Sequence, residues 1–221
     1  MATTMALNTY QLKFIELAQQ VNALSFGEFT LKSGRISPYF FNAGQFATGK
    51  SLWHLAECYA DKILESPITF DVIFGPAYKG IPLATAIAII LSQKTGQDIP
   101  WAFNRKEAKD HGEGGSIVGS PIRGKVLVVD DVITAGTAIK ETMALLADSE
   151  GDISDVLVAL DRQEVAPNQT QSAIQMIATQ YHINTHAIIT LDDLIAFANQ
   201  DAHSQNYLPE LTAYRQQYGI K

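Results

Sequence analysis

The 221-residue sequence has a single cysteine, Cys58, so the chain cannot form an internal disulfide. We therefore expect a protein of a reducing compartment, in which Cys58 packs inside a helix rather than acting as a nucleophile. Positive charge is also scarce, because 16 lysines and arginines stand against 23 acidic residues and leave a net charge of −7. This balance argues against nucleic acid as the main partner.

Long apolar runs are missing as well. The longest nearly apolar run, from Ile81 to Leu91, is too short to span a bilayer, and it contains Pro82 and Thr85. The first residues lack a basic stretch followed by an apolar core, so no secretory signal is expected. A composition that is 47% apolar and 18% charged excludes a disordered chain. We expect a soluble, cytoplasmic protein with no membrane partner, folded as one α/β domain over residues 1–221.

The chain is organised around the run Val126-Leu-Val-Val-Asp-Asp-Val-Ile-Thr-Ala-Gly-Thr-Ala138. Four apolar residues that end in Asp130 and Asp131 predict a buried parallel strand, and the residues beyond them predict a loop that runs into a helix. The backbone N–H groups and hydroxyls of residues 134–138 suit a phosphate monoester, whereas the two carboxylates suit a diol or its metal. A sugar phosphate satisfies both ends. The P-loop and Gly-x-Gly-x-x-Gly spacings are absent from this run.

A predicted hairpin near the N-terminus turns around Gly34. Its aromatic residues are expected to contribute to a core, which is a purely structural interpretation. A functional interpretation adds to it, because Lys32 and Arg35 beside the turn can face an anion. Phe40 and Phe41 can wall a flat ring.

Two more loops and one strand end carry basic residues that could face an anionic ligand. After an expected strand at Phe70–Phe74, Lys79 precedes an apolar helix, a position where a second phosphate group fits. Residues 105–116 combine several basic side chains with glycines. Alone they predict a flexible surface loop, but between two phosphate-suited loops we interpret them as a basic lid that closes over anions. Arg162 follows the expected strand Ile153–Leu160, and its planar fork suits a carboxylate or a ring carbonyl.

Strands that alternate with helices from Phe70 to Leu191 predict a doubly wound, mostly parallel sheet with a core of about residues 68–191. Before it, the spacing of apolar residues predicts a helix over Tyr10–Leu24. The N-terminal segment, about residues 1–48, carries its own hairpin and does not fit a strand–helix unit of the sheet. We expect it to form a small hood over the ligand edge, together with the C-terminal helices.

The run that ends at Ala138 closely resembles the phosphoribosyl pyrophosphate (PRPP) signature of the type I phosphoribosyltransferases. With Phe29–Asn42, Gly75–Gly80 and Arg105–Gly115, nearly the whole chain is similar to orotate phosphoribosyltransferases of the bacterial or fungal type. The resemblance implies the type I phosphoribosyltransferase fold and a Mg2+-dependent transfer of ribose 5-phosphate from PRPP to orotate. The products would be orotidine 5-phosphate and pyrophosphate, in the biosynthesis of UMP. It also implies a homodimer with shared active sites and Mg2+ held mainly through PRPP.

The resemblance further implies roles for individual residues. The implied orotate contacts are Lys32, Phe40, Phe41, Thr134 and Arg162. The implied PRPP contacts are Tyr78, Lys79, Arg105, Lys106, Lys109, His111, Asp130, Asp131, Val132, Ile133, Thr134, Ala135, Gly136, Thr137 and Ala138. The implied catalytic residues are Lys109, Asp131 and His111, and we take Lys109 as the principal electrostatic catalyst.

Two alternatives remain at this point. One is a PRPP-sensing regulator without catalysis, which predicts a missing lid or an added DNA-binding module, and neither is visible in the sequence. The other is a type I transferase for a purine base or uracil. Arg162 and Lys32 beside the two phenylalanines favour an acidic, carbonyl-rich pyrimidine, but only substrate testing separates these transferases.

Overall fold

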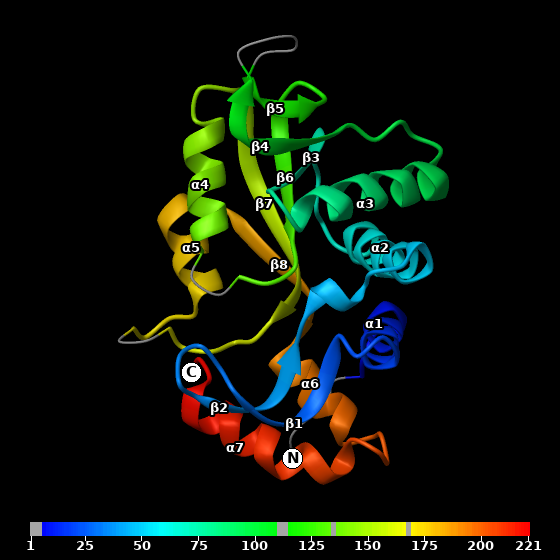
Figure 1. Ribbon diagram of the computed structural model, residues 1–221, viewed down its shortest axis with the longest axis vertical. Helices are drawn as coiled ribbons and strands as arrows, with labels where there is room; N and C mark the ends of the chain where they lie inside the picture. The colour runs from blue at the N-terminus through cyan, green and yellow to red at the C-terminus, as the bar shows by residue number, and fades with distance from the viewer. Residues whose placement is uncertain (1–5, 110–114, 134–135, 167–168) are drawn as a thin grey trace.

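The structure is a computed structural model that describes residues 6–109, 115–133, 136–166 and 169–221 (Figure 1). For residues 106–109 and 115 it describes the backbone only. The strands are β1 Leu24–Thr30, β2 Ile36–Phe41, β3 Val72–Gly75, β4 Trp101–Lys109, β5 Gly115–Gly119, β6 Arg123–Asp130, β7 Glu150–Asp161 and β8 Asn184–Thr190. The α-helices are α1 Thr9–Gln20, α2 Gly49–Leu64, α3 Gly80–Thr95, α4 Thr137–Leu146, α5 Ala173–Tyr181, α6 Leu191–Ala198 and α7 Leu208–Tyr218.

Six of the strands form one sheet in the order β5-β4-β3-β6-β7-β8. All neighbouring pairs in this sheet are parallel except β4 and β5. The predicted mostly parallel, doubly wound α/β sheet is therefore confirmed. Because β3, β6 and β7 run in the same direction, the loops that follow them leave from the same edge of the sheet.

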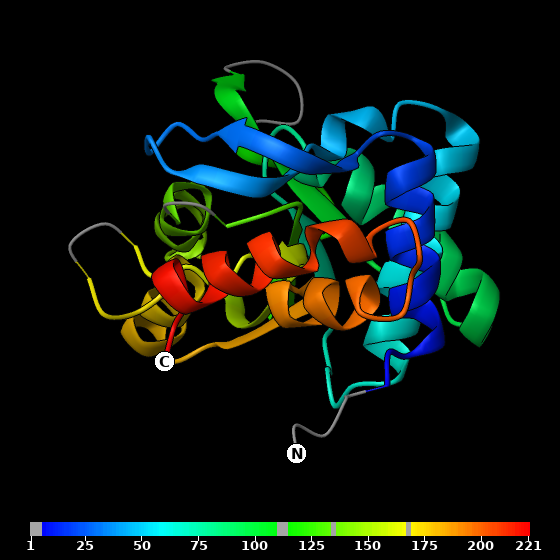
Figure 2. The same cartoon turned by 90° about the horizontal axis from the view of Figure 1, so that it is seen from below.

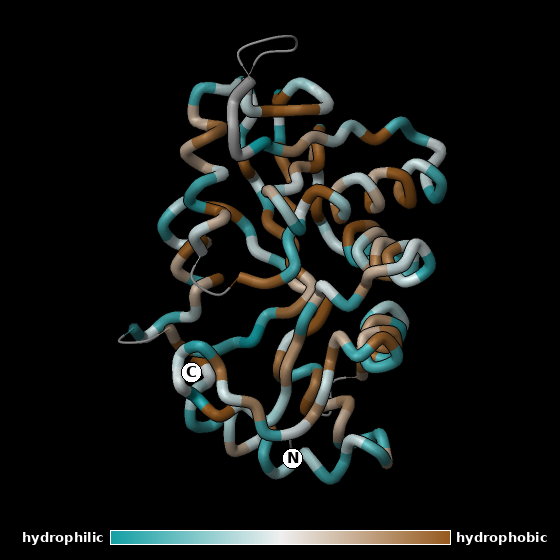
Figure 3. The backbone as a smooth tube through the Cα atoms, in the orientation of Figure 1, coloured by the Kyte–Doolittle hydropathy of each residue, from teal (hydrophilic) through white to brown (hydrophobic). Residues whose placement is uncertain are grey.

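Both faces of the sheet are buried, and β6 shows why its sequence is apolar at consecutive positions. Val126 and Val128 pack into a cluster that includes residues of α4 and α5, whereas Leu127 and Val129 pack into the cluster of α1, α2 and α3. Figure 1 shows these two groups of helices on opposite sides of the sheet, and Figure 3 shows the apolar residues gathered along the strands between them.

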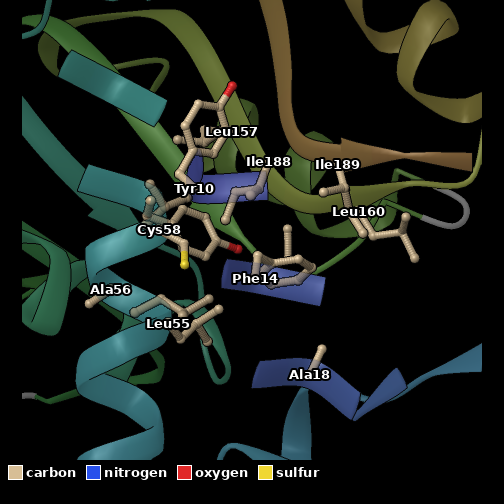
Figure 4. Close-up of a cluster of buried hydrophobic side chains, with 14 of the residues drawn as sticks. Tyr10, Phe14, Ala18, Leu55, Ala56, Cys58, Leu157, Leu160, Ile188 and Ile189 are labelled. Atoms are coloured by element: carbon tan, nitrogen blue, oxygen red, sulfur yellow. The ribbon is translucent and has the colours of Figure 1, made fainter. Parts of the chain in front are cut away.

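The larger cluster joins the N-terminal helices to the sheet (Figure 4). Phe14 of α1, Leu55 of α2 and Ile188 of β8 all belong to this cluster, and Cys58 is 3% exposed. Burial raises the pKa of the Cys58 thiol to about 12, so the thiol is not a nucleophile near neutral pH. The prediction of a packed cysteine is confirmed. Within the described ranges, no helix has both the length and the apolar character needed to cross a membrane.

Several helices begin at residues that cap them. In α2, α5 and α6 the side-chain oxygen of the residue before the helix accepts a hydrogen bond at 3.2 Å from the backbone N–H three residues later. The capping residues are Thr48, Ser172 and Thr190. Each cap satisfies a backbone donor that the helix itself leaves free, so local sequence fixes where these helices start.

The hairpin β1-β2 forms a separate antiparallel sheet that contacts α7 (Figure 2). The prediction of a helix over Tyr10–Leu24 is too long, because α1 ends at Gln20 and Leu24 already belongs to β1. Asn22 has φ 57°, a left-handed conformation that asparagine tolerates, and it turns the chain out of the helix. Apolar spacing alone could not show this turn.

The basic stretch predicted as a loop, residues 105–116, is partly a β-ribbon. Strand β4 continues to Lys109, and β5 begins at Gly115 and pairs with it in antiparallel fashion. The register sets Asn104 opposite Ile117. The sequence hid this ribbon because charged residues and glycines, which are rare in strands, occupy much of it. The intervening residues 110–114 lie outside the described part of the chain.

Candidate active site

Two adjacent carboxylates end strand β6 at the edge where the β3, β6 and β7 loops meet. Asp130 and Asp131 are only 9% and 6% exposed. Nζ of Lys79, in the β3–α3 loop, lies 2.5 Å from Oδ2 of Asp131. The structure thus brings together Lys79 and Asp131, which are 52 positions apart in the sequence.

Hydrogen bonds hold the acidic pair in place. The backbone N–H of Asp131 donates to Oδ1 of Asp130, and the N–H of Val132 donates to Oδ1 of Asp131, both at 2.9 Å. The Tyr59 hydroxyl donates to the backbone oxygen of Asp130 at 2.7 Å, and the Ala159 N–H donates to that of Asp131 at 2.9 Å. Two neighbouring elements, α2 and β7, therefore fix the direction in which β6 ends.

Burial, followed by repulsion from the Asp131 carboxylate, raises the pKa of Asp130 to about 6. The ionised form of Asp130 is costly because the site removes it from water and sets a second negative charge beside it. Hydroxyl donors or a nearby positive charge on a ligand would relieve this cost. A carboxyl group with such a raised pKa at a strand end is the kind of group found at ligand-binding sites.

A small cavity of about 100 Å³ lies beside Asp130, at the start of α4. Its lining residues are Asp130, Val132, Ile133, Gly136, Thr137, Ala138 and Ile139. Gly136 precedes α4 with φ 73°, and a Cβ atom there would lie 2.5 Å from Cδ1 of Ile177, so both conformation and space require glycine. Backbone N–H groups at a helix start favour anions. The predicted contacts Thr134 and Ala135 lie outside the described residues.

The β3–α3 loop folds tightly between two glycines. A Cβ atom on Gly75 would lie 2.0 Å from the backbone oxygen of Gly80, so no side chain fits. Oδ1 of Asn104, in β4, accepts a hydrogen bond at 2.8 Å from the N–H of Ala77. The peptide bond from Ala77 to Tyr78 is cis, and Tyr78 is 66% exposed. This arrangement carries Lys79 to the acidic pair.

A third group of side chains surrounds Arg162 after the end of β7, and we call it the arginine cluster. Its members are Arg35, Ser37, Tyr39, Arg162 and Glu164. Arg162 donates from Nε to Oε1 of Glu164 at 2.7 Å and from Nη2 to the Ser37 hydroxyl at 3.0 Å. Its guanidinium carbon lies 4.3 Å from the ring centroid of Tyr39. The cluster therefore ties the hairpin to the strand that ends at the ligand edge.

The predicted orotate contacts of the hairpin lie in different environments. Lys32 is exposed in the turn between β1 and β2. Phe40 is 43% exposed, with its ring centroid 5.6 Å from that of Phe29, whereas Phe41 is 8% exposed and packs against Phe14. Successive strand residues point to opposite faces, so only the ring of Phe40 remains accessible to a ligand.

The predicted lid residues are only partly described. Arg105 is half-buried in β4. Lys106 and Lys109 also belong to β4, but their side chains lie outside the described part of the structure. His111 falls within residues 110–114, which are likewise not described. The structure therefore locates the start of the basic stretch and does not test the roles predicted for these side chains.

The sequence interpretation missed three residues that support this edge. Asn104 and Tyr59 hold loop backbones, and Glu164 pairs with Arg162. Asn104 could have been noticed as a polar residue at the end of an apolar core segment. Glu164 lies two positions after Arg162, yet nothing in the sequence shows that the chain bends back to join them. In the sequence, Tyr59 looks like an ordinary core residue of a helix.

The chain is similar in sequence to known phosphoribosyltransferases. A family model described as a phosphoribosyl transferase domain matches residues 43–193. Over 214 residues, which cover 97% of this chain and 100% of the relative, the sequence is 52% identical to orotate phosphoribosyltransferase of Proteus mirabilis. The corresponding enzyme of Haemophilus influenzae is 52% identical over the same share of both chains.

A solved structure shows the same relationship. The crystal structure of orotate phosphoribosyltransferase from Francisella tularensis matches with a TM-score of 0.85 and 43% identity, covering 93% of this chain and 98% of that one. The chain belongs to the orotate phosphoribosyltransferases. It is therefore a glycosyltransferase that joins a phosphoribosyl group to orotate, a step of pyrimidine biosynthesis. The predicted family and reaction are confirmed, and the regulator and the purine or uracil transferase are not supported.

Proposed function

We propose that the enzyme performs this transfer at the carboxyl edge of the sheet, with PRPP along the β6–α4 loop and orotate beside the arginine cluster. The observation that carries the proposal is that Asp130, the first residue of the acidic pair, lines the cavity at the start of α4. Carboxylates suit the hydroxyls of a ribose, while helix-start N–H groups and the Thr137 hydroxyl suit its 5-phosphate. The proposed phosphate loop comprises Val132, Ile133, Thr134, Ala135, Gly136, Thr137 and Ala138.

The chemistry needs charges at both ends of the bond that breaks. When the anomeric carbon separates from pyrophosphate, positive charge develops on the ribose and negative charge on the leaving group. Asp130 and Asp131 stand where they would stabilise the ribose, and Lys79 would face the pyrophosphate. Tyr78, Arg105, Lys106, Lys109 and His111 complete the proposed PRPP contacts through the family resemblance. No covalent nucleophile is required.

We also propose that the reaction uses Mg2+ held mainly by PRPP. Among the described residues, no group of three or more histidine, cysteine or acidic side chains forms a metal cage. Mg2+ commonly binds through one or two carboxylates together with substrate phosphates and water, and Asp130 and Asp131 fit that requirement. The ion would neutralise charge on the pyrophosphate group. Chelation should therefore abolish turnover, and added Mg2+ should restore it.

For orotate, the proposed contacts are Lys32, Phe40, Phe41, Thr134 and Arg162. The Arg162 fork suits a carboxylate or a ring carbonyl, and the exposed ring of Phe40 can lie against the pyrimidine. Because Phe41 is buried, its proposed contribution is to position the backbone and the neighbouring Phe40 rather than to offer its own ring. Residues of about 1–48 and the C-terminal helices would act as the hood over this end.

We propose a cytoplasmic homodimer in which the basic stretch of one subunit reaches the site of the other. The exposed side chains of Trp53 on α2 and Ile89 on α3, which are 47% and 61% exposed, support an apolar contact surface on these two neighbouring helices. Lys109 would then act across the interface as the principal electrostatic catalyst. Orotate turnover measured with Lys109→Ala tests this role, and near-normal turnover would contradict it.

Mixing two inactive variants tests the shared site. Subunits with Lys109→Ala and subunits with Asp131→Asn should form hybrid dimers in which one site combines both changes and the other is intact. If the subunits exchange freely, activity should recover to about a quarter of that of the unchanged enzyme. No recovery, although sedimentation and labelled subunits demonstrate hybrid dimers, would overturn the exchange of catalytic residues between subunits.

A further inference from the structure

Glu164 lies between two guanidinium groups that come from distant parts of the chain. Its Oε1 is 2.6 Å from Nη2 of Arg162, which follows β7, and its Oε2 is 3.5 Å from Nη1 of Arg35, in the turn of the β1-β2 hairpin. Arg35 also donates to the backbone oxygen of Val165 at 2.9 Å. One carboxylate therefore joins the hairpin that carries Lys32 to the strand end that carries Arg162.

This junction is shielded from water. The side chains of Glu164, Arg162 and Arg35 are 13%, 15% and 19% exposed. Ion pairs in such an environment are screened less than surface pairs. Without the carboxylate between them, the two neighbouring guanidinium groups would repel one another and could change position.

Hydrogen bonds also fix the backbone on both sides of Glu164. Gln163 adopts φ 51°, and its N–H donates to Oδ1 of Asp161 at 2.8 Å. Its backbone oxygen accepts from the N–H of Ile220, and the N–H of Val165 donates to the backbone oxygen of Tyr218. The left-handed residue reverses the chain locally, so that Arg162 and Glu164 meet, and the C-terminal segment holds that reversal in place.

The fork of Arg162 is consequently oriented but not fully used. Hydrogen bonds to Glu164 and Ser37 use Nε and Nη2, and neither of these bonds uses Nη1. The Tyr39 ring supports one face of the guanidinium group. Nη1 carries two N–H groups, which suits a planar acceptor such as a carboxylate or a carbonyl.

We propose that Glu164 is a positioning residue for orotate: by joining Arg162 to Arg35 it holds the guanidinium fork and the hairpin in the relative arrangement that binds the pyrimidine. This inference rests on the proposed orotate site. It assigns to Glu164 no contact with either substrate and no part in the PRPP site, which lies around the β6 end.

The first test is the steady-state kinetics of Glu164→Gln with each substrate varied in turn. The KM for orotate should rise about tenfold, as expected for the loss of one charged hydrogen bond, while the KM for PRPP stays within about twofold. Glu164→Asp, whose shorter side chain can still pair with one arginine, should show a smaller rise. Glu150→Gln is the matched control, because it makes the same chemical change, removes a 2.9 Å ion pair with Arg123 at the start of β6 and β7, and leaves Arg162 paired.

A double-mutant cycle tests whether Glu164 acts through Arg162. In an Arg162→Gln background, Glu164→Gln should change the KM for orotate by less than about twofold. An additive effect, an unchanged KM for orotate in the single variant, or an equal rise of both KM values would overturn the proposal. If Arg162→Gln itself leaves the KM for orotate unchanged, the proposed orotate site fails instead, so the two failures are distinguishable.

Discussion

The loop that begins with Asp130 and Asp131 and leads to Gly136 is called the acidic loop here. It and the arginine cluster beyond β7 lie at the same edge of the sheet, but they are assembled in different ways. In the acidic loop, Asp130 and Asp131 accept hydrogen bonds from the residues that follow them. In the arginine cluster, Arg162 and Ser37 are 125 positions apart, and Arg35 and Val165 are 130 apart. One end of the site is a local motif, and the other exists only in the folded chain.

This difference has a functional consequence. The contacts that hold the acidic pair come from β6, α2, β7 and the β3–α3 loop and not from the hairpin, so the PRPP end should tolerate changes in the hairpin. The orotate end depends on how the hairpin, β7 and the C-terminal segment meet. We therefore expect substitutions at the two ends to affect different substrates.

Asp131→Asn should give the largest loss. The change removes the negative charge opposite Lys79 and beside the proposed ribose position, so kcat/KM for PRPP should fall by about two to three orders of magnitude. Orotate absorbance measures turnover, and protection of the fold against heat by PRPP measures binding. Asp61→Asn is the control, because it breaks a 2.8 Å ion pair with Lys94 on α2 and α3. Unaltered PRPP kinetics in Asp131→Asn would remove the acidic loop from the proposed mechanism.

Arg162→Gln should affect mainly the other substrate. Loss of the charged fork should raise the KM for orotate by about ten- to a hundredfold, with a much smaller change in the KM for PRPP. Initial rates over a matrix of both substrate concentrations separate the two constants. If Arg162→Gln and Asp131→Asn raise the same KM, the division of the edge into two ends is wrong.

The same contrast explains what the sequence could predict. The acidic loop, its strand and the helix after it were predictable because apolar runs, adjacent carboxylates and glycine all occur within 13 consecutive positions. Arg162 could be placed at a strand end, but its partners could not. Glu164 meets Arg162 because Gln163 adopts a left-handed conformation, and no propensity marks a glutamine for that.

Strands that contain many residues rare in strands were also not predicted from the sequence. Strand β5 and the end of β4 pair through their backbones although their residues include glycines and charged side chains, so neither period nor propensity revealed them. The opposite error arose at Phe40 and Phe41, which look equivalent in the sequence. Strand alternation buries Phe41 and exposes Phe40, and only the pairing of β1 with β2 determines which face is covered.

Gly136→Ala tests whether the acidic loop needs a glycine at the start of α4. Its new Cβ atom would lie 2.5 Å from Cδ1 of Ile177, on a backbone in the left-handed conformation. We therefore expect the free energy of unfolding to fall by about 1–3 kcal/mol and PRPP to bind more weakly. Gly96→Ala is a matched control, since Gly96 has a similar φ of 71° and its added Cβ atom would have no side chain or distant backbone atom within 4 Å. Thermal unfolding with and without PRPP measures both effects. Equal unfolding temperatures and equal PRPP protection for the two variants would show that contact with Ile177 does not matter.

The charge of Asp130 should make the stability of the folded chain depend on pH. Its pKa is about 6 in the folded chain, because of burial and the Asp131 carboxylate, against an ordinary value of 3.8. Between about pH 4 and about pH 6 the folded state retains a proton that the unfolded chain has released. Ionisation of Asp130 therefore lowers the free energy of unfolding as the pH rises through this window.

Asp130→Asn removes that group, so the unfolding temperature of the variant relative to the unchanged enzyme should increase from about pH 4 to about pH 6 and then stay level. Thermal unfolding without ligand, in buffers of equal ionic strength, measures this difference. The arginine cluster supplies the contrast, because its guanidinium groups remain charged throughout that range. If the difference in unfolding temperature stays constant with pH, burial and the Asp131 carboxylate do not raise the pKa of Asp130. The acidic loop and the arginine cluster would then not differ in how their stability depends on pH.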